Sequence, residues 1–221
     1  EILERMRLER VDLFFLHSNI ISDDYDASAY VDRPATRWTT YIDQFVPVCE
    51  KLKADGRIGA WGITGIGIPD CILWALGETP RPAAVQCITN LLNSPGELQY
   101  FPGPSRTREL IAATKATGSG VLGIRPVQGG ALCDTLDRDL PDGHGVVVDF
   151  AKSEDFRTIA AELGTSAAAL AHRYALTIDD VDTVVLGCKN REELAECVAA
   201  EAAGLLDTEI IARIDASVLQ S

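Results

Sequence analysis

Five short apolar runs alternate with longer amphipathic segments along the chain. The runs are nearly continuous in hydrophobic residues and lack the strict alternation of a half-exposed strand, a pattern typical of strands buried on both faces of a parallel sheet. They cover residues 11–17, 58–64, 83–90, 120–127 and 183–189.

The segments between these runs show helical periodicity. Over residues 37–55 the apolar side chains recur on one helix face, Pro47 predicts a kink or a late start, and Gly56 is placed to cap the C-terminus. Residues 18–36 and 128–149 are expected to be irregular, and loops of that length are usually functional or mobile. Further helices are predicted over 69–77, 106–117, 153–163, 166–177, 191–203 and 208–219.

The alternation of strands and helices predicts one α/β domain with a parallel sheet and right-handed crossovers. Two architectures fit this order. A doubly wound sheet of five strands is complete within 221 residues, whereas a (β/α)8 barrel typically needs about 250 residues. The periodicity alone does not choose between them.

Charge and composition narrow the range of partners. The net charge of −13 argues against nucleic acid and gives no support for an anionic membrane surface. No stretch approaches the roughly 18 unbroken apolar residues of a membrane helix. The six cysteines form no CxxC pair and have no zinc-ligand spacing, so we expect reduced, structural cysteines, a cytoplasmic location and no metal site.

One candidate for chemistry is His17, which ends the run VDLFFLH. Loops at the C-terminal ends of parallel strands build the functional sites of α/β proteins, so an imidazole at this position is well placed for catalysis. The alternative is a structural histidine that caps a buried strand. Position alone does not separate the two.

Five motifs in order resemble the aldo-keto reductases, an eight-stranded barrel family that reduces carbonyls with a nicotinamide cofactor. The motifs are VDLFFLH, LKADGRIGAWGIT, PAAVQCITNLLN, GVLGIRPVQGGAL and VDTVVLGCKNREELAECVAA. The resemblance implies a (β/α)8 TIM barrel of which this chain holds the fourth to eighth strands, with residues 1–221 as a single, incomplete barrel domain. We therefore expect the chain to be the C-terminal part of a longer protein. The family's catalytic Asp, Tyr and Lys lie on the first three strands, so the chain alone is expected to be inactive.

The resemblance also implies roles around the nicotinamide. His17 takes the position of the family histidine that orients the carbonyl and assists proton transfer from a Tyr. Thr64 and Gln86 match residues that contact the carboxamide, whereas Gly65 stands where the family usually has Asn. Ile124 replaces the Tyr that stacks on the nicotinamide ring.

A second set of residues matches positions around the cofactor phosphates. Arg125 is expected to reach a cofactor phosphate or an anionic substrate, with an ion pair to a neighbouring carboxylate as an equal alternative. Gly129 belongs to the loop that in the family closes over the pyrophosphate. Lys189 is expected to face the adenosine phosphate, and Asn190 begins a helix whose N-terminus suits an anion. Asn190 and Glu193 also fit a plain capping box.

The expected cofactor is NADP, with NAD as an alternative because Glu193 stands where the family commonly has Gln. Cys197 likewise stands where the family has Asn. The predicted function is an oxidoreductase that transfers a hydride between the nicotinamide cofactor and a small-molecule carbonyl or alcohol substrate. Two other readings stay open: a catalytically silent cofactor-binding barrel acting as a sensor or partner subunit, and a doubly wound binding domain without a redox role.

Overall fold

The computed structural model describes residues 2–26, 28, 35–99 and 101–219. The chain forms two compact units, one made of Glu1–Cys87 with Tyr100–Val121 and the other of Ile88–Gln99 with Leu122–Ser221. The first is called unit 1 and the second unit 2. Strands β5 (Ala84–Ile88) and β6 (Gly120–Ile124) begin in unit 1 and end in unit 2.

The strands of unit 1 are parallel and in register. Strand β1 (Val11–Leu16) pairs with β4 (Ile58–Thr64), and β4 pairs with β5. Leu16 lies opposite Ile63, and Thr64 lies opposite Gln86. The neighbouring residues Ile63 and Thr64 of β4 are both buried, and because successive side chains point to opposite faces, this strand is covered on both faces.

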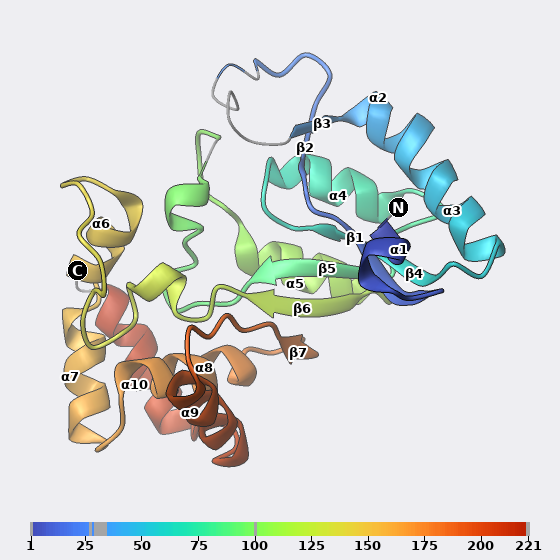
Figure 1. Ribbon diagram of the computed structural model, residues 1–221. Helices are drawn as coiled ribbons and strands as arrows, with labels where there is room; N and C mark the ends of the chain where they lie inside the picture. The colour runs from blue at the N-terminus through green and yellow to red at the C-terminus, as the bar shows by residue number, and fades with distance from the viewer. Residues whose placement is uncertain (1, 27, 29–34, 100, 220–221) are drawn as a thin grey trace. The chain divides into compact units, whose positions relative to one another are not determined.

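The strand order is β1-β4-β5-β6-β7, so each strand is added next to the one before it in the chain. Figure 1 shows β5 and β6 side by side. A doubly wound sheet reverses its strand order at a switch point, and this order has none. The doubly wound alternative is therefore wrong.

The long helical segment of unit 1 changes its hydrogen-bonding pattern ahead of Pro47. It consists of α2 (Trp38–Thr40), a π-helical turn (Tyr41–Phe45) and α3 (Val46–Ala54). The Val46 N–H donates to the Tyr41 carbonyl, five residues back. Pro47 has no N–H to continue the α-helical ladder, which accounts for the irregular turn before it, and α3 begins at Val46 with Pro47 in its first turn, in line with the late start predicted as one alternative. Gly56, at φ 72°, follows the helix end.

Short elements escaped the sequence pattern. Strands β2 (Asn19–Ile21) and β3 (Ala35–Arg37) form a small parallel sheet within the segment predicted to be irregular. Ile20 and Ile21 are buried there, and the Arg37 guanidinium donates to the carbonyls of Ser22, Asp23 and Tyr25. Three-residue strands are too short to show a period.

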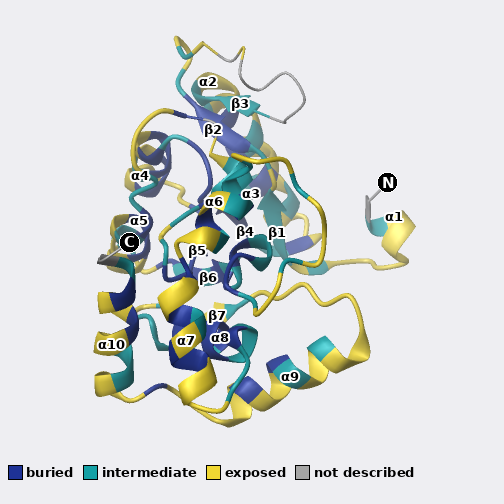
Figure 2. Ribbon diagram, turned by 90° about the vertical axis from the view of Figure 1, so that its left-hand side faces the viewer, coloured by how far each residue is buried: buried dark blue, intermediate teal, exposed yellow. Residues whose placement is uncertain are grey.

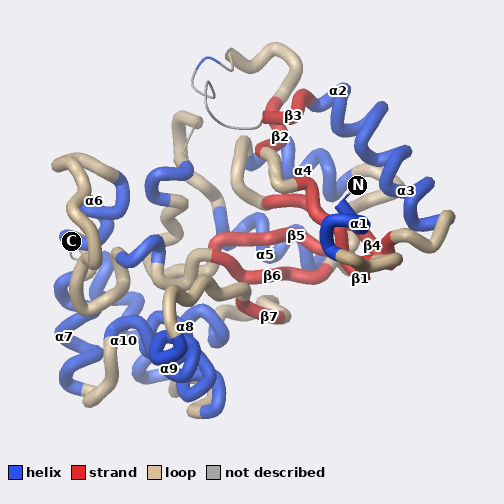
Figure 3. The backbone as a smooth tube through the Cα atoms, viewed as in Figure 1, coloured by secondary structure: helices blue, strands red, loops and turns tan. Residues whose placement is uncertain are grey.

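The helices of unit 1 that remain are α1 (Ile2–Met6), α4 (Pro69–Gly77) and α5 (Thr107–Ala116). Figure 3 shows helices and strands alternating along this part of the chain. The bounds of α4 and α5 match the predicted helices. Pro69 lies in the first turn of α4, where a missing N–H costs no helical hydrogen bond.

Unit 2 is mainly helical. Its helices are α6 (Gly145–Ala151), α7 (Glu154–Glu162), α8 (Ala167–Thr177), α9 (Arg191–Ala202) and α10 (Thr208–Leu219), with 3₁₀ turns at Gly96–Leu98 and Gln128–Gly130. Buried side chains such as Phe156, Leu170 and Ile214 form its core. The Ser166 hydroxyl accepts from the Ala169 N–H at 3.0 Å and caps α8. None of the helices in the described ranges is both long and apolar enough to cross a membrane.

Two sequence expectations fail at the edges of the sheet. The run over 183–189 forms a strand only at β7 (Thr183–Val184), and Val185 and Leu186 beyond it are exposed. The side chains of β1 are at most half-buried. Both strands lie at the ends of the strand order, where one side lacks a neighbour, so burial on both faces holds for β4 but not for them.

Helix α6 also lies in a predicted loop, and His144 caps it by accepting from the Val146 N–H.

Candidate functional site

His17 directly follows β1 and its side chain is exposed. It makes no hydrogen bond with any residue in the described ranges. Leu16, the last residue of β1, pairs with Ile63, and Thr64 pairs with Gln86, so a row of C-terminal strand ends carries the paired Thr64 and Gln86 and, just beyond β1, His17. Cross-strand partners in a sheet direct their side chains to the same face. The register therefore joins two of the predicted residues, Thr64 and Gln86, and places the third, His17, directly after the end of the neighbouring strand.

Thr64 and Gln86 are joined by a hydrogen bond. The Thr64 hydroxyl donates to Gln86 Oε1 at 3.1 Å, and the Thr64 side chain is buried. No described residue accepts from Gln86 Nε2, which leaves the amide N–H₂ available to a ligand. Thr64 thus holds the Gln86 amide in a fixed orientation, with its N–H₂ group as the donor.

Gly65 departs from the family pattern for a local reason. Its N–H donates to the Gln86 carbonyl at 2.8 Å. A Cβ at Gly65 would lie 2.7 Å from that same carbonyl oxygen and 3.0 Å from Val85 Cγ1. A side chain such as Asn does not fit here without moving the backbone of β5.

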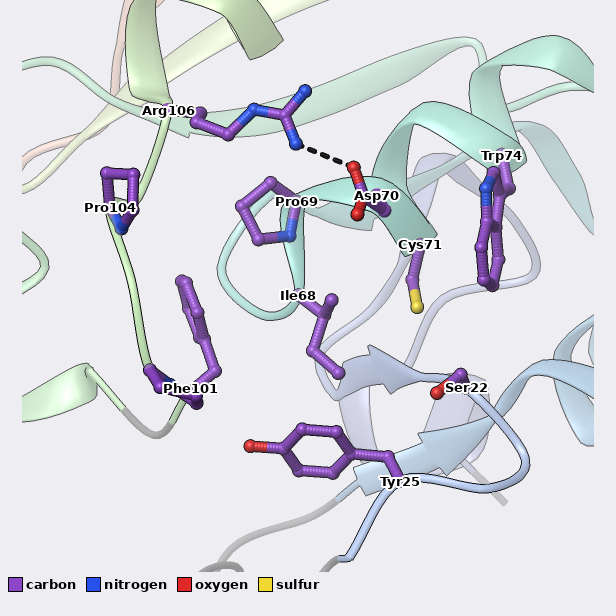
Figure 4. Close-up of a pocket in the computed structure, with 11 residues that line it drawn as sticks. Ser22, Tyr25, Ile68, Pro69, Asp70, Cys71, Trp74, Phe101, Pro104 and Arg106 are labelled. Carbon is purple, nitrogen blue, oxygen red and sulfur yellow. Dashed lines mark hydrogen bonds and ion pairs between the residues drawn. The ribbon is translucent and has the colours of Figure 1, made fainter.

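Unit 1 also holds a pocket of about 360 Å³ that the sequence did not indicate. Tyr25, Trp74 and Phe101 line it together with the first turn of α4 (Figure 4). Arg106 closes one side through ion pairs with Asp70 and Glu109, both at 2.6 Å. These residues come from three segments far apart in the sequence, and no motif joins them.

In unit 2, Arg125 follows β6 and is bound by side chains of its own unit. Its Nη2 lies 2.8 Å from Glu97 Oε2, and its Nε donates to Gln128 Oε1 at 2.9 Å. The ion pair that the sequence left as an alternative is therefore formed. A contact between Arg125 and a cofactor phosphate stays a prediction.

The turn after Arg125 rests on a buried carboxylate that sequence reasoning missed. Asp149 of α6 is buried and accepts from Gln128 Nε2 and from the Ser94 hydroxyl, each at 2.6 Å. Gln128 is itself fully buried and begins the 3₁₀ turn Gln128–Gly130. The network of Arg125, Gln128 and Asp149 thus holds the diglycine turn in place. An isolated Asp in a predicted loop gives no sequence signal for this role.

Gly129 needs to be glycine at this position. Its φ is 61°, and a Cβ would lie 2.9 Å from Arg125 Nη2 and 3.2 Å from Val146 Cγ2. Its carbonyl accepts from Arg138 at 2.9 Å. Gly129 and Gly130 line a cleft of about 430 Å³ within unit 2, which also includes Lys189 and Glu193.

Lys189 faces this cleft between two carboxylates. Its ammonium group is paired with Asp137 and lies 3.2 Å from Glu193 Oε1. The bonds to Asp137 and Glu193 raise the pKa of Lys189, and the Lys189 side chain lowers the pKa of Asp137. The pKa of Glu193 is lowered chiefly by the backbone N–H of Lys189, which donates to Oε2 at 2.8 Å.

Asn190 caps α9 as the capping-box interpretation predicted. Its Oδ1 accepts from the Glu193 N–H at 2.8 Å. The glutamate reaches back to the N–H of Lys189, one residue before the position of a standard capping box. No group of three or more His, Cys, Asp or Glu side chains within the described ranges is arranged to hold a metal ion.

Comparisons with known proteins give a consistent result. A family model described as "Aldo/keto reductase family" matches residues 1–218. L-galactose dehydrogenase from Arabidopsis thaliana is 25% identical, with 98% of this chain and 61% of that protein covered. The chain therefore spans less than two thirds of this relative.

Two solved structures share the fold. The aldo-keto reductase AKR11C1 from Bacillus halodurans, in its holo form, has a TM-score of 0.66 at 22% identity, over 97% of this chain and 63% of that one. The glycerol dehydrogenase AKR11B4 from Gluconobacter oxydans has a TM-score of 0.65 at 18% identity, over 99% of this chain and 61% of that one.

Proposed function

The chain belongs to the aldo/keto reductase family, and on that premise we propose that it supplies the cofactor-binding part of an NAD(P)-dependent oxidoreductase. The reaction is hydride transfer between the cofactor and a small-molecule carbonyl or alcohol. The observation that carries the proposal is the row of His17, Thr64 and Gln86 at the ends of three adjacent strands. The five strands correspond to the fourth to eighth of an eight-stranded barrel, and together they make one domain, as the resemblance implies.

In unit 1, each residue of the row has a distinct task. When bound, the nicotinamide cofactor gives or accepts the hydride. The amide of Gln86, oriented by Thr64, donates to the carboxamide and fixes the angle of the ring. The His17 imidazole, free of protein partners in the described ranges, hydrogen-bonds the substrate oxygen and orients it for proton transfer.

In unit 2, the cleft fits the phosphate part of a dinucleotide. Gly129 and Gly130 let the backbone approach a ligand closely, and the N-terminus of α9 presents the positive end of the helix dipole. Lys189 adds one cation and Asn190 fixes the start of the helix. Arg125, through Glu97 and Gln128, holds the diglycine turn and lies near Gly129, and a contact with a phosphate would require it to exchange its ion pair with Glu97.

The choice between NADP and NAD turns on the carboxylates of this cleft. The family resemblance implies NADP. Four carboxylates and two cations of the described residues line the cleft: Asp134, Asp137, Glu193 and Glu196, with Lys189 and Arg138. Lys189 is already neutralised by Asp137 and Glu193, so a 2′-phosphate has to displace a carboxylate. NADP, from the family resemblance, is the first candidate and NAD the second. The carboxylates support NAD, because a carboxylate accepts well from a ribose 2′-hydroxyl.

The reaction is tested at 340 nm in both directions: oxidation of NADPH and NADH is followed with a panel of aldehydes, and reduction of NADP+ and NAD+ is followed with sugars and polyols. L-galactose and glycerol belong in the panel because they give two of the related proteins their names. The full-length gene product is expected to turn over, and His17→Ala to lose at least a hundredfold in kcat while it still binds cofactor. His144→Ala, which removes a helix cap elsewhere, is the matched control.

The 221-residue chain by itself is expected to bind cofactor without turnover, because none of its residues matches the family's catalytic Asp, Tyr and Lys. Cofactor binding by the full-length product with no turnover on any substrate supports the silent cofactor-binding barrel instead. Absence of both binding and turnover refutes the proposal.

A further inference from the structure

Two cysteines, one just before α9 and one in its middle, form a thiol–imidazole cluster with His172 of α8. Cys188 lies just before the helix, and its sulfur is 3.8 Å from the sulfur of Cys197. On the other side of Cys197, the Nε2 atom of His172 is 3.2 Å from the Cys197 sulfur. The cluster therefore brings two thiols and one imidazole within contact distance inside unit 2.

Exposure separates the two thiols. Cys188 is the exposed cysteine, whereas Cys197 is buried in the helix face that packs on α8. Figure 2 shows that most of α9 is exposed, so Cys188 is accessible to solutes at the start of an open helix. The other four cysteines are buried or half-buried.

Burial also keeps the competing thiols protonated. It raises the pKa of Cys49 and Cys87 to about 12, and that of Cys71 and Cys133 to about 11. A thiolate is the reactive form, so these buried cysteines react slowly with oxidants. The pKa of Cys197 is also raised, to about 11, by burial and by the neighbouring Cys188.

His172 supplies what Cys197 needs to react. Burial lowers the pKa of His172, with Glu196 acting in the opposite direction, so the imidazole is neutral near pH 7. Its Nδ1 is buried with no partner in the described structure, while Nε2 faces the Cys197 sulfur. A neutral imidazole whose Nδ1 carries the proton presents a free Nε2 lone pair to the Cys197 thiol.

We propose that Cys188 and Cys197 form a peroxide-sensitive dithiol that closes into an intramolecular disulfide. Closure brings the sulfurs from 3.8 Å to the bonding distance of about 2.05 Å. Cys188 lies in the loop between β7 and α9, outside any helix or strand, so its side chain has room to move.

The chemistry balances with a peroxide as the two-electron oxidant. The Cys188 thiol loses its proton to solvent and the thiolate attacks the peroxide. The O–O bond breaks, Cys188 becomes a sulfenic acid, and the departing hydroxide or alkoxide takes up a proton from solvent to leave as water or an alcohol. Cys197 then passes its proton to His172 Nε2 and its sulfur attacks the Cys188 sulfur. The S–O bond breaks, the leaving hydroxide takes that proton, and water is released. Two thiols are oxidised to one disulfide, and the peroxide is reduced.

Closure alters the cleft that contains Lys189. Cys197 lines this cleft, and Cys188 is the neighbour of Lys189, whose backbone N–H donates to Glu193. A bond that draws Cys188 onto α9 displaces the Lys189 backbone and its ammonium group. Resting on the proposed function, the consequence is weaker dinucleotide binding in the oxidised protein.

The linkage is tested by treating the reduced protein with stoichiometric hydrogen peroxide, alkylating the remaining thiols and mapping the peptides by mass spectrometry. We expect a peptide pair joined through Cys188 and Cys197 and a fall of two in free thiols, reversed by dithiothreitol. Cys133→Ser, which alters another thiol of the same cleft, is expected to form the same link. In Cys197→Ser, the Cys188 sulfenic acid is expected to accumulate and to be trapped by dimedone.

The outcomes separate this inference from the proposed function. Cys188 that remains a free thiol, over-oxidises in the unsubstituted protein, or links to any other cysteine overturns the dithiol. The dissociation constant for NADP and NAD, measured before and after oxidation, is expected to rise at least fivefold, and not to change in Cys188→Ser. If the disulfide forms and the dissociation constants for NADP and NAD do not change, the proposed effect on the cleft is wrong. If the reduced protein binds neither cofactor, the proposed function is refuted. The peptide map still shows whether Cys188 and Cys197 form a disulfide.

Discussion

Replacing Asp149 tests whether the buried network holds the diglycine turn. Asp149 accepts from the Gln128 amide and the Ser94 hydroxyl, both at 2.6 Å, and Gln128 is fully buried. Hydrogen bonds to a charged group contribute about 1.5–3 kcal/mol each, and losing an acceptor leaves the buried donor unsatisfied. Because the two bonds share one carboxylate, their losses do not add in full. We expect Asp149→Ala to lose about 3 kcal/mol in the free energy of unfolding, roughly a 150-fold change in the unfolding equilibrium.

Urea denaturation followed by circular dichroism measures this loss. With a slope of about 2 kcal/mol per molar urea, the midpoint of Asp149→Ala is expected to fall by about 1.5 M. Asp149→Asn keeps one acceptor oxygen and is expected to lose about 1 kcal/mol. Asp139→Ala, at an exposed position nearby in the sequence, is the control and is expected to stay within about 0.5 kcal/mol. A midpoint for Asp149→Ala equal to that of the control refutes the role given to Asp149.

Two further predictions concern the backbone beside Gln86 and the buried imidazole. Gly65→Ala is expected to destabilise the protein by about 1–3 kcal/mol, because its Cβ would meet the Gln86 carbonyl at 2.7 Å. Thermal unfolding checks this against Gly77→Ala, where a Cβ meets nothing within 4 Å, and equal melting points would contradict it. The pKa of His172 is lowered, so stability is fully present above pH 6.5 and is lost as the pH falls below that value. Urea midpoints between pH 7.5 and 5 are expected to fall less steeply in His172→Gln, and an unchanged slope would argue against a buried neutral imidazole.

Most of the regular structure could be predicted from sequence because it is long and strongly periodic. The helices from α4 to α10, apart from α6, lie within a residue or two of their predicted bounds. The irregular turn before Pro47 could be predicted because a proline lacks an N–H and disrupts the hydrogen bonds of the helix in its own neighbourhood. The elements that failed depend on distant contacts: β2 and β3 pair with each other across the chain, and β7 ends early at the edge of the sheet.

In the candidate site, too, some residues could be predicted from sequence motifs and others depend on contacts between distant parts of the chain. Sequence motifs pointed to His17, Thr64 and Gln86, and strand register places them in one row. No motif reveals Asp149, because its partner Gln128 is distant in the chain and the bond exists only in the folded unit. The contact of Cys188 with Cys197 also escaped detection, since a spacing of nine residues across a helix start matches no known pattern. For Arg125, the sequence allowed either a phosphate contact or an ion pair, and the described structure contains the ion pair.

The most direct test of the central claim is isothermal titration of the reduced chain with NADP and with NAD. Binding of at least one cofactor with a micromolar dissociation constant is the expected result. Lys189→Ala is expected to weaken NADP binding more than NAD binding, because Lys189 is the cation proposed to meet the 2′-phosphate. Heats for both cofactors that match a buffer blank up to millimolar concentration would contradict the account.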